Sequence, residues 1–175
     1  KNALCTPIRK TQESRISMRP SISPASASTI TSISKTFTPI LIVRLLKRSA
    51  EAYQNVLKEW TRKRVPLNWA TTFNNLGTVL RLLGETRKGP RTLEQSVAAF
   101  RNALAERTRE MVPLDWAMTQ NNLGAALQSL GKRQEDVILL EEAVIAYENA
   151  LLEITPQKSQ INWAMTLANL AAARM

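Results

Sequence analysis

The sequence predicts an all-α fold built from repeated pairs of helices. Three observations support this prediction: an internal repeat with a period of 47 residues, apolar residues spaced as in amphipathic helices, and polar, variable segments between them. Six aromatic residues mark the period in two series, Trp69, Trp116 and Trp163, and Tyr53, Phe100 and Tyr147. Such a period is typical of an array whose neighbouring units bury a shared core.

The first helix of each copy is predicted to follow the segments that contain Pro66, Pro113 or Gln160. Asn68, Asp115 and Asn162 are candidate N-caps, because their side-chain oxygens can accept hydrogen bonds from backbone N–H groups. Gly84 and Gly131 are candidate helix ends, because glycine readily adopts the left-handed conformation that closes a helix. The predicted ranges of these first-type helices are about 68–84, 115–131 and 162–175.

One side of each first-type helix is apolar. In the first copy this stripe consists of Trp69, Phe73, Leu76 and Leu80, which lie close together on a helical wheel. The stripe, tryptophans included, is therefore predicted to be buried.

The second helix of each copy alternates small and large apolar residues, as at Phe100, Ala103 and Leu104. This alternation lets neighbouring helices approach closely. The predicted ranges of these second-type helices are about 41–64, 92–111 and 136–155.

Residues 1–40 are rich in Ser, Thr and Pro and show no helical period. Residues 1–48 hold nine Lys or Arg and one acid, Glu13, whereas the remainder of the chain has a net charge of only +2 out of +10. We expect residues 1–40 to be a disordered or loosely attached basic leader and residues 41–175 to be the repeat array. An organelle transit peptide is an alternative for the leader, because its composition is Arg-rich, Ser-rich and acid-poor.

The composition excludes several kinds of catalytic site. The chain has no His and one Cys, Cys5, so it contains no Ser-His-Asp or Cys-His nucleophile arrangement and no His-ligated metal. None of its five glycines forms a phosphate-binding loop. We therefore expect no enzyme activity, no catalytic residue, no cofactor and no metal. A single Cys also favours a reducing, cytoplasmic location.

The longest apolar run, PILIVRLL, is interrupted by Arg44 and is much shorter than the roughly 20 residues that span a bilayer. The sequence therefore predicts no transmembrane segment.

Two further motifs resemble the tetratricopeptide repeat. The first-type helices carry a Leu-Gly pair, and the second-type helices carry Ala or Ser, an aromatic residue four positions later and Ala three beyond that. The matching residues are Leu76-Gly77 and Leu123-Gly124, then Ser96-Phe100-Ala103 and Ala143-Tyr147-Ala150. The unit is longer than the usual period of about 34 residues. It looks like the long variety found in bacterial multidomain proteins, including those with a caspase-like protease domain or a signalling ATPase.

The resemblance implies a right-handed α-α superhelix that serves as a protein-protein interaction scaffold. Its first-type helices would line a concave groove, into which the Asn at one repeat position would project. Asn amides can bind the N–H and C=O groups of an extended peptide, as in tetratricopeptide domains of kinesin light chain and chaperone cofactors. The predicted groove residues are Thr71, Asn74, Asn75, Thr78, Met118, Asn121, Asn122, Met165 and Asn169. The alternative is that these Asn side chains bond to the neighbouring repeat or to water.

Other binding modes fit the sequence less well. A clamp for a C-terminal carboxylate uses basic residues where this chain has Thr71, Met118 and Met165. Two alternatives to a peptide-binding scaffold stay open: a sensor arm of a larger enzyme, and nucleic-acid binding through the basic leader, which we do not expect. We also expect marginal stability in isolation or self-association, because Trp163, Leu167 and Leu170 would be exposed on one side of helix 162–175.

Overall fold

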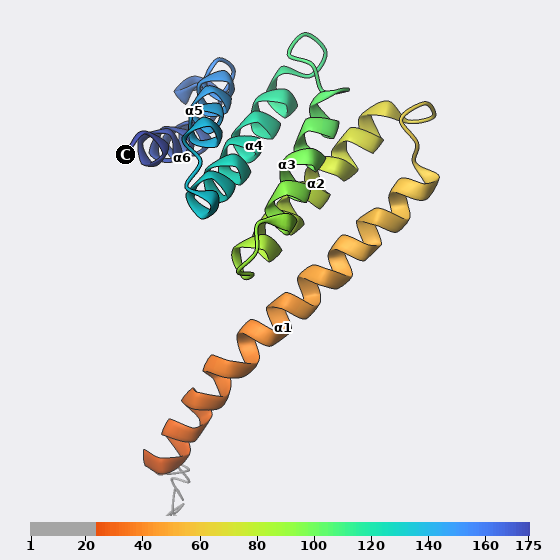
Figure 1. Cartoon of the computed structure of the whole chain (residues 1–175). Coiled ribbons are helices and arrows are strands. Elements are labelled where there is room, and N and C mark those ends of the chain that lie inside the picture. The colour runs from red at the N-terminus through yellow and green to blue at the C-terminus, as the bar shows by residue number, and fades with distance from the viewer. Residues whose placement is uncertain (1–23) are drawn as a thin grey trace, which may run out of the picture. The chain divides into compact units, whose positions relative to one another are not determined.

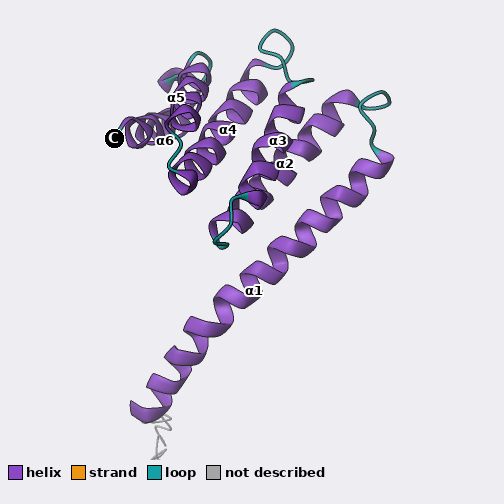
Figure 2. Cartoon of the chain, in the orientation of Figure 1, coloured by secondary structure: helices purple, strands orange, loops and turns teal. Residues whose placement is uncertain are grey.

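The computed structural model describes the backbone of residues 24–175 and the side chains from Pro39 onward. This part of the chain forms six helices and no strand (Figures 1 and 2), which confirms the predicted all-α solenoid. The helices are α1 (Pro24–Glu59), α2 (Pro66–Glu85), α3 (Arg91–Leu104), α4 (Pro113–Gln134), α5 (Val137–Leu151) and α6 (Pro156–Arg174). Residue contacts divide the chain into residues 1–37 and 38–175.

The first helix begins earlier than predicted, at Pro24 instead of about residue 41. Proline suits the first position of a helix, where its missing N–H is not needed. The helix continues through Pro39, although a proline inside a helix lacks the backbone N–H for one hydrogen bond. Residues 1–23 of the predicted leader lie outside the described part of the chain.

The helices α2, α4 and α6 are the first-type helices, and α1, α3 and α5 are the second-type helices. Each helix from α2 to α6 packs against the next, and α4 also contacts both α2 and α6. No Cα atom of α3 lies within 8 Å of one in α5. Because the first-type helices lie closer together than α3 and α5 do, they form the inner face of the array.

Glycines in the first-type helices make room for large side chains of the second-type helices. A Cβ atom on Gly77 would lie 2.8 Å from the Phe100 ring, and one on Gly124 would lie 2.9 Å from the Tyr147 ring. Both rings are fully buried. The Leu-Gly pair thus permits the close packing of each helix pair.

The prediction that Gly84 and Gly131 close the first-type helices in a left-handed conformation was wrong. Gly84 and Gly131 are buried inside α2 and α4, where Leu93 and Leu140 pack against them. The left-handed residue after α4 is Glu135, with φ 56°. Close packing, not a left-handed conformation, therefore explains these two glycines.

The predicted N-caps were also wrong. The helices α2 and α4 begin at Pro66 and Pro113, and Val65 and Val112 precede them without a side-chain cap. In α6 the backbone is extended at Ser159, whose hydroxyl accepts a hydrogen bond from Asn162 N at 3.4 Å. The prolines fix the start of a helix through their restricted φ, so no capping side chain is required.

The second-type helices end earlier than predicted, at Glu59, Leu104 and Leu151 instead of 64, 111 and 155. The backbone N–H groups of Arg107 and Ile154 still bond to Ala103 O and Ala150 O. The segments that follow α3 and α5 therefore start as a final turn and then lead to the next proline, which leaves the side chains of Arg107 and Ile154 buried.

The tryptophans are less buried than predicted, because Trp69, Trp116 and Trp163 are each only half-buried. Leu170, expected to be exposed, is buried in the cluster formed by α3, α4 and α5, while Leu167 stays 36% exposed. No helix in the described part of the chain is long and apolar enough to cross a membrane.

Candidate interaction surface

The asparagines of the inner face connect successive first-type helices. Asn122 Nδ2 donates to Asn74 Oδ1 at 3.2 Å, and Asn169 Nδ2 donates to Asn121 Oδ1 at 3.4 Å. The same bond therefore occurs once between α2 and α4 and once between α4 and α6. These contacts agree with the alternative that the Asn residues bond to the neighbouring repeat.

An inter-repeat bond uses one N–H of an amide that has two, and the amide carbonyl accepts two hydrogen bonds. Asn122 and Asn169 are half-buried, so part of each side chain reaches the surface. Asn75, the corresponding residue of α2, accepts a hydrogen bond from its neighbour Asn74 at 3.3 Å. A structural contact and contact with a ligand are therefore compatible at these positions.

The two predicted threonines differ in their surroundings. Thr71 is exposed, and its hydroxyl donates to Leu67 O at 2.8 Å. Thr78 is half-buried, and its hydroxyl donates to Asn74 O at 3.1 Å. Of these two hydroxyls, that of Thr71 also accepts a hydrogen bond from Arg107, which lies in the segment after α3.

A pocket of about 200 Å³ lies between α4 and α6. It brings together four predicted groove residues, namely Met118, Asn121, Asn122 and Met165. The sequence did not predict that its other lining residues, Ile154, Asn162 and Thr166, belong to the groove. Since Met118 and Met165 are 49% and 60% exposed, flexible thioether side chains form the rim of this pocket.

Arg107 occupies the corresponding place between α2 and α4 and was missed by the sequence analysis. Its side chain is only 8% exposed. Nη1 donates to Thr119 Oγ1 at 2.9 Å, and Nη2 donates to Thr71 Oγ1 at 3.0 Å. Burial lowers the pKa of the Arg107 guanidinium, and the nearby Asp115 carboxylate opposes this shift. Its place in the repeat holds Trp60 and Ile154 in the other copies, so no recurring residue type marked it.

An Arg side chain lies over the ring of each of two tryptophans, and each of these Arg side chains also pairs with a Glu. The guanidinium carbons of Arg62 and Arg109 lie 5.8 Å and 5.7 Å from the ring centroids of Trp69 and Trp116. Arg62 also pairs with Glu106, and Arg109 pairs with Glu153 at 2.9 Å. Arg62, part of the basic cluster 62–64, is thus already paired with an acid and placed over a ring.

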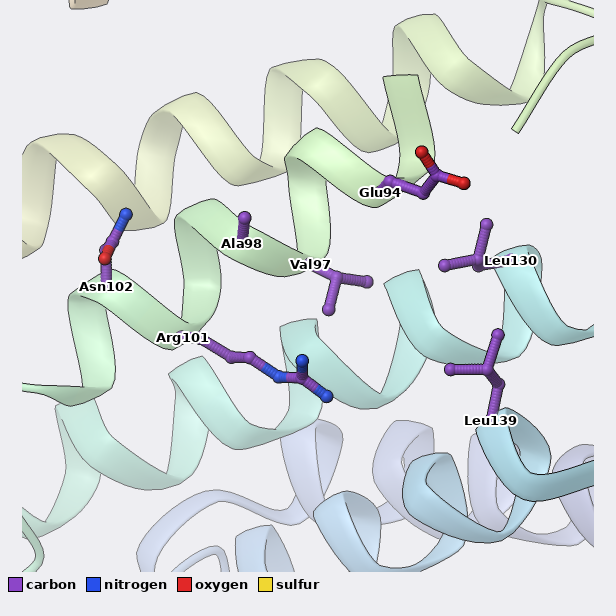
Figure 3. Close-up of a pocket in the computed structure, with 7 residues that line it drawn as sticks. All are labelled: Glu94, Val97, Ala98, Arg101, Asn102, Leu130 and Leu139. Atoms are coloured by element: carbon purple, nitrogen blue, oxygen red, sulfur yellow. The ribbon is translucent and has the colours of Figure 1, made fainter. Parts of the chain in front are cut away.

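A second pocket, of about 370 Å³, lies on the side of the second-type helices (Figure 3). Five of its lining side chains come from α3, and Leu130 and Leu139 come from α4 and α5. Arg101 pairs with Glu142 at 2.7 Å, and Glu94 accepts a hydrogen bond from Gln134 at 3.1 Å. Because protein groups already pair with its charged side chains, this pocket is a weaker candidate than the inner face.

The described residues contain no group of three or more Asp, Glu, Cys or His side chains that could hold a metal ion. A family model of the tetratricopeptide repeat matches residues 116–156. This segment is similar to a tetratricopeptide repeat. The match spans one helix pair, from Trp116 in α4 to the beginning of α6. Comparisons with curated proteins and with solved structures found no match.

Tetratricopeptide repeats act in general as protein-protein interaction modules and as non-catalytic scaffolds. In this chain, the inner face combines polar amides, a methionine-rimmed pocket and a buried guanidinium. These groups can bind backbone amides and apolar or charged side chains of a partner.

Proposed function

We propose that residues 41–175 bind an extended segment of a partner protein along the inner face formed by α2, α4 and α6. The pocket between α4 and α6 carries this proposal, because it places Met118, Met165 and Ile154 beside the amides of Asn121 and Asn122. An apolar side chain of the ligand occupies the pocket. The amides bond to its backbone.

The size and exposure of the pocket support this function. A volume of about 200 Å³ accommodates one aliphatic side chain, not a cofactor. Its two Met side chains are exposed in the chain alone, so a ligand would bury apolar surface at roughly 25 cal/mol per Å². Methionine also adapts its shape to different ligands.

The test uses the full chain and a library of displayed 12-residue peptides. Peptides selected on the native chain are synthesised with a fluorescent label, and their affinities are measured by anisotropy. The variant Met118→Glu with Met165→Glu should weaken binding by about 10-fold or more, because it places two charges at the rim of an apolar pocket.

Met111→Glu is the matched control. Met111 is 65% exposed and lines none of the pockets described above, so this substitution should leave affinity unchanged. Circular dichroism and thermal melts check that all variants fold. Peptides that bind the Met118 and Met165 double variant as tightly as the native chain would show that the inner face is not the binding site.

A further inference from the structure

On the inner face, the region between α2 and α4 and the region between α4 and α6 are lined by residues of opposite chemistry. Ile154 contributes to the pocket between α4 and α6. Arg107, which is its counterpart 47 residues earlier, contacts Thr71 and Thr119 between α2 and α4. These two threonines correspond to Met118 and Thr166, which line the pocket between α4 and α6. The Arg107 guanidinium therefore occupies the repeat position that the apolar side chain of Ile154 occupies beside the pocket between α4 and α6.

The surroundings of Arg107 balance its charge incompletely. Its nearest carboxylate oxygen is Asp115 Oδ2, 3.9 Å away, and that side chain is itself 55% exposed. The other hydrogen-bond acceptors are neutral: the hydroxyls of Thr71 and Thr119 and the Asp115 carbonyl at 3.5 Å. A buried cation is costly without a close anion, and the guanidinium stays protonated in proteins.

The threonine hydroxyls are oriented so that they can only accept from Arg107. The hydroxyl of Thr71 donates its proton to Leu67 O, and that of Thr119 donates to Asp115 O at 2.7 Å. They thus hold the guanidinium in place without neutralising it. The hydrogen bonds with Thr71, Thr119 and the Asp115 carbonyl use three of the five N–H donors of a guanidinium, so a carboxylate can approach the others on the side of the exposed Thr71.

We propose that Arg107 forms an acid-selective subsite of the inner face, next to the apolar pocket between α4 and α6. The ligand is an extended segment with an internal Asp or Glu side chain at Arg107 and a Leu, Ile or Met side chain in the pocket. This inference rests on the proposed function and adds the chemistry of the partner. A carboxylate that pairs with a mostly desolvated guanidinium forms a strong, charge-assisted hydrogen bond.

The same peptide selection tests this subsite, on the native chain and on Arg107→Ile. Isoleucine is the residue that the next repeat uses at this position, and replacing a buried charge by an apolar residue is often neutral for stability. Peptides from the native chain should be enriched in Asp or Glu at a fixed distance from an aliphatic residue or Met. Peptides from Arg107→Ile should keep the apolar residue and lose the acid.

Synthetic peptides then measure the pairing directly. Replacing the selected Glu by Gln should weaken binding to the native chain by about 10-fold and should change binding to Arg107→Ile by less than about 2-fold. A C-terminal amide in place of the free carboxylate should have no effect, since the subsite takes an internal side chain. Arg101→Ile removes the same charge from an exposed position of α3 and should behave as the native chain does.

The outcomes separate this inference from the proposed function. Peptides that need Met118 and Met165 but show no preference for an acid would overturn the acid-selective subsite alone. The same conclusion would follow if Glu-to-Gln replacement reduced the affinity equally for the native chain and for Arg107→Ile. If the native chain selects no peptide at the inner face, both proposals fail. If Arg107→Ile does not fold, the Glu and Gln peptides are compared on the native chain and on Arg107→Lys. The subsite is rejected if the native chain binds the Gln peptide as tightly as the Glu peptide.

Discussion

Asn122 Nδ2 of α4 donates a hydrogen bond to Asn74 Oδ1 of α2 at 3.2 Å, and the bond recurs one repeat later from Asn169 to Asn121. This pairing joins neighbouring repeats directly across the inner face. Asn122 therefore has a structural contact in addition to the ligand contact proposed for it.

Asn122→Ala should lower the free energy of unfolding by about 1 kcal/mol, because it removes the hydrogen bond with Asn74 from a half-buried site. Asn75→Ala should cost less, since Asn75 only accepts a longer bond from the adjacent Asn74. Urea denaturation followed by circular dichroism measures both values. Equal stability of the two variants would contradict a structural role for the inter-repeat bond.

Gly124→Ala should destabilise the fold by about 1 to 3 kcal/mol, because the new Cβ would lie 2.9 Å from the buried ring of Tyr147. Gly89→Ala is the control. A Cβ at Gly89 meets no atom within 4 Å, and its φ is not positive, so this change should be neutral or slightly stabilising. Thermal melts of the two variants provide the comparison, and a drop of similar size at both positions would reject the packing explanation.

Tyr147 should make stability fall in alkaline solution. Burial raises the pKa of its phenol to about 12 from an ordinary value of 10, and nearby Arg81 partly opposes the shift. The folded state holds the phenol proton more tightly than the unfolded state. The contribution of Tyr147 to the free energy of unfolding is therefore complete below pH 10. It is lost as pH rises from 10 to about 12, by roughly 2 to 3 kcal/mol in total.

Tyr147→Phe is the natural control for this titration, because Phe100 fills the same position in the preceding repeat. The hydrogen bond from the Tyr147 hydroxyl to Gln128 Oε1 at 3.2 Å is lost in this variant. Urea melts between pH 9 and pH 12 should show a shallower decline for Tyr147→Phe than for the native chain. Parallel curves would mean that Tyr147 does not titrate in this range.

The chain on its own should associate through α6, where Ile161 and Leu167 are 73% and 36% exposed. Sedimentation velocity over a range of concentrations measures this association. Leu167→Lys should reduce it, because burying an unpaired charge in an apolar contact is unfavourable. Ala168→Lys adds the same charge at an exposed position on the same helix and should have a smaller effect; a concentration-independent sedimentation coefficient for the native chain would reject the prediction.

The 47-residue period was sufficient to predict the helix pairs and their order. These features depend on residue types that recur in each copy, and recurrence is visible in a sequence. Boundaries were less predictable. Helix starts followed the prolines instead of Asn68, Asp115 and Asn162, and the sequence alone does not show which of two adjacent signals prevails.

The sequence by itself determined the repeated helix pairs and the residue types that the inner face presents. Only the tertiary structure decided which groups meet there, because the partners of each side chain come from the next repeat. Asn122 bonds to Asn74, 48 positions away, and Arg107 reaches Thr71 across 36 positions. Arg107 and Ile154 share one repeat position but differ in chemistry, so periodicity marked the position and only packing showed that one is a buried cation and the other a pocket wall.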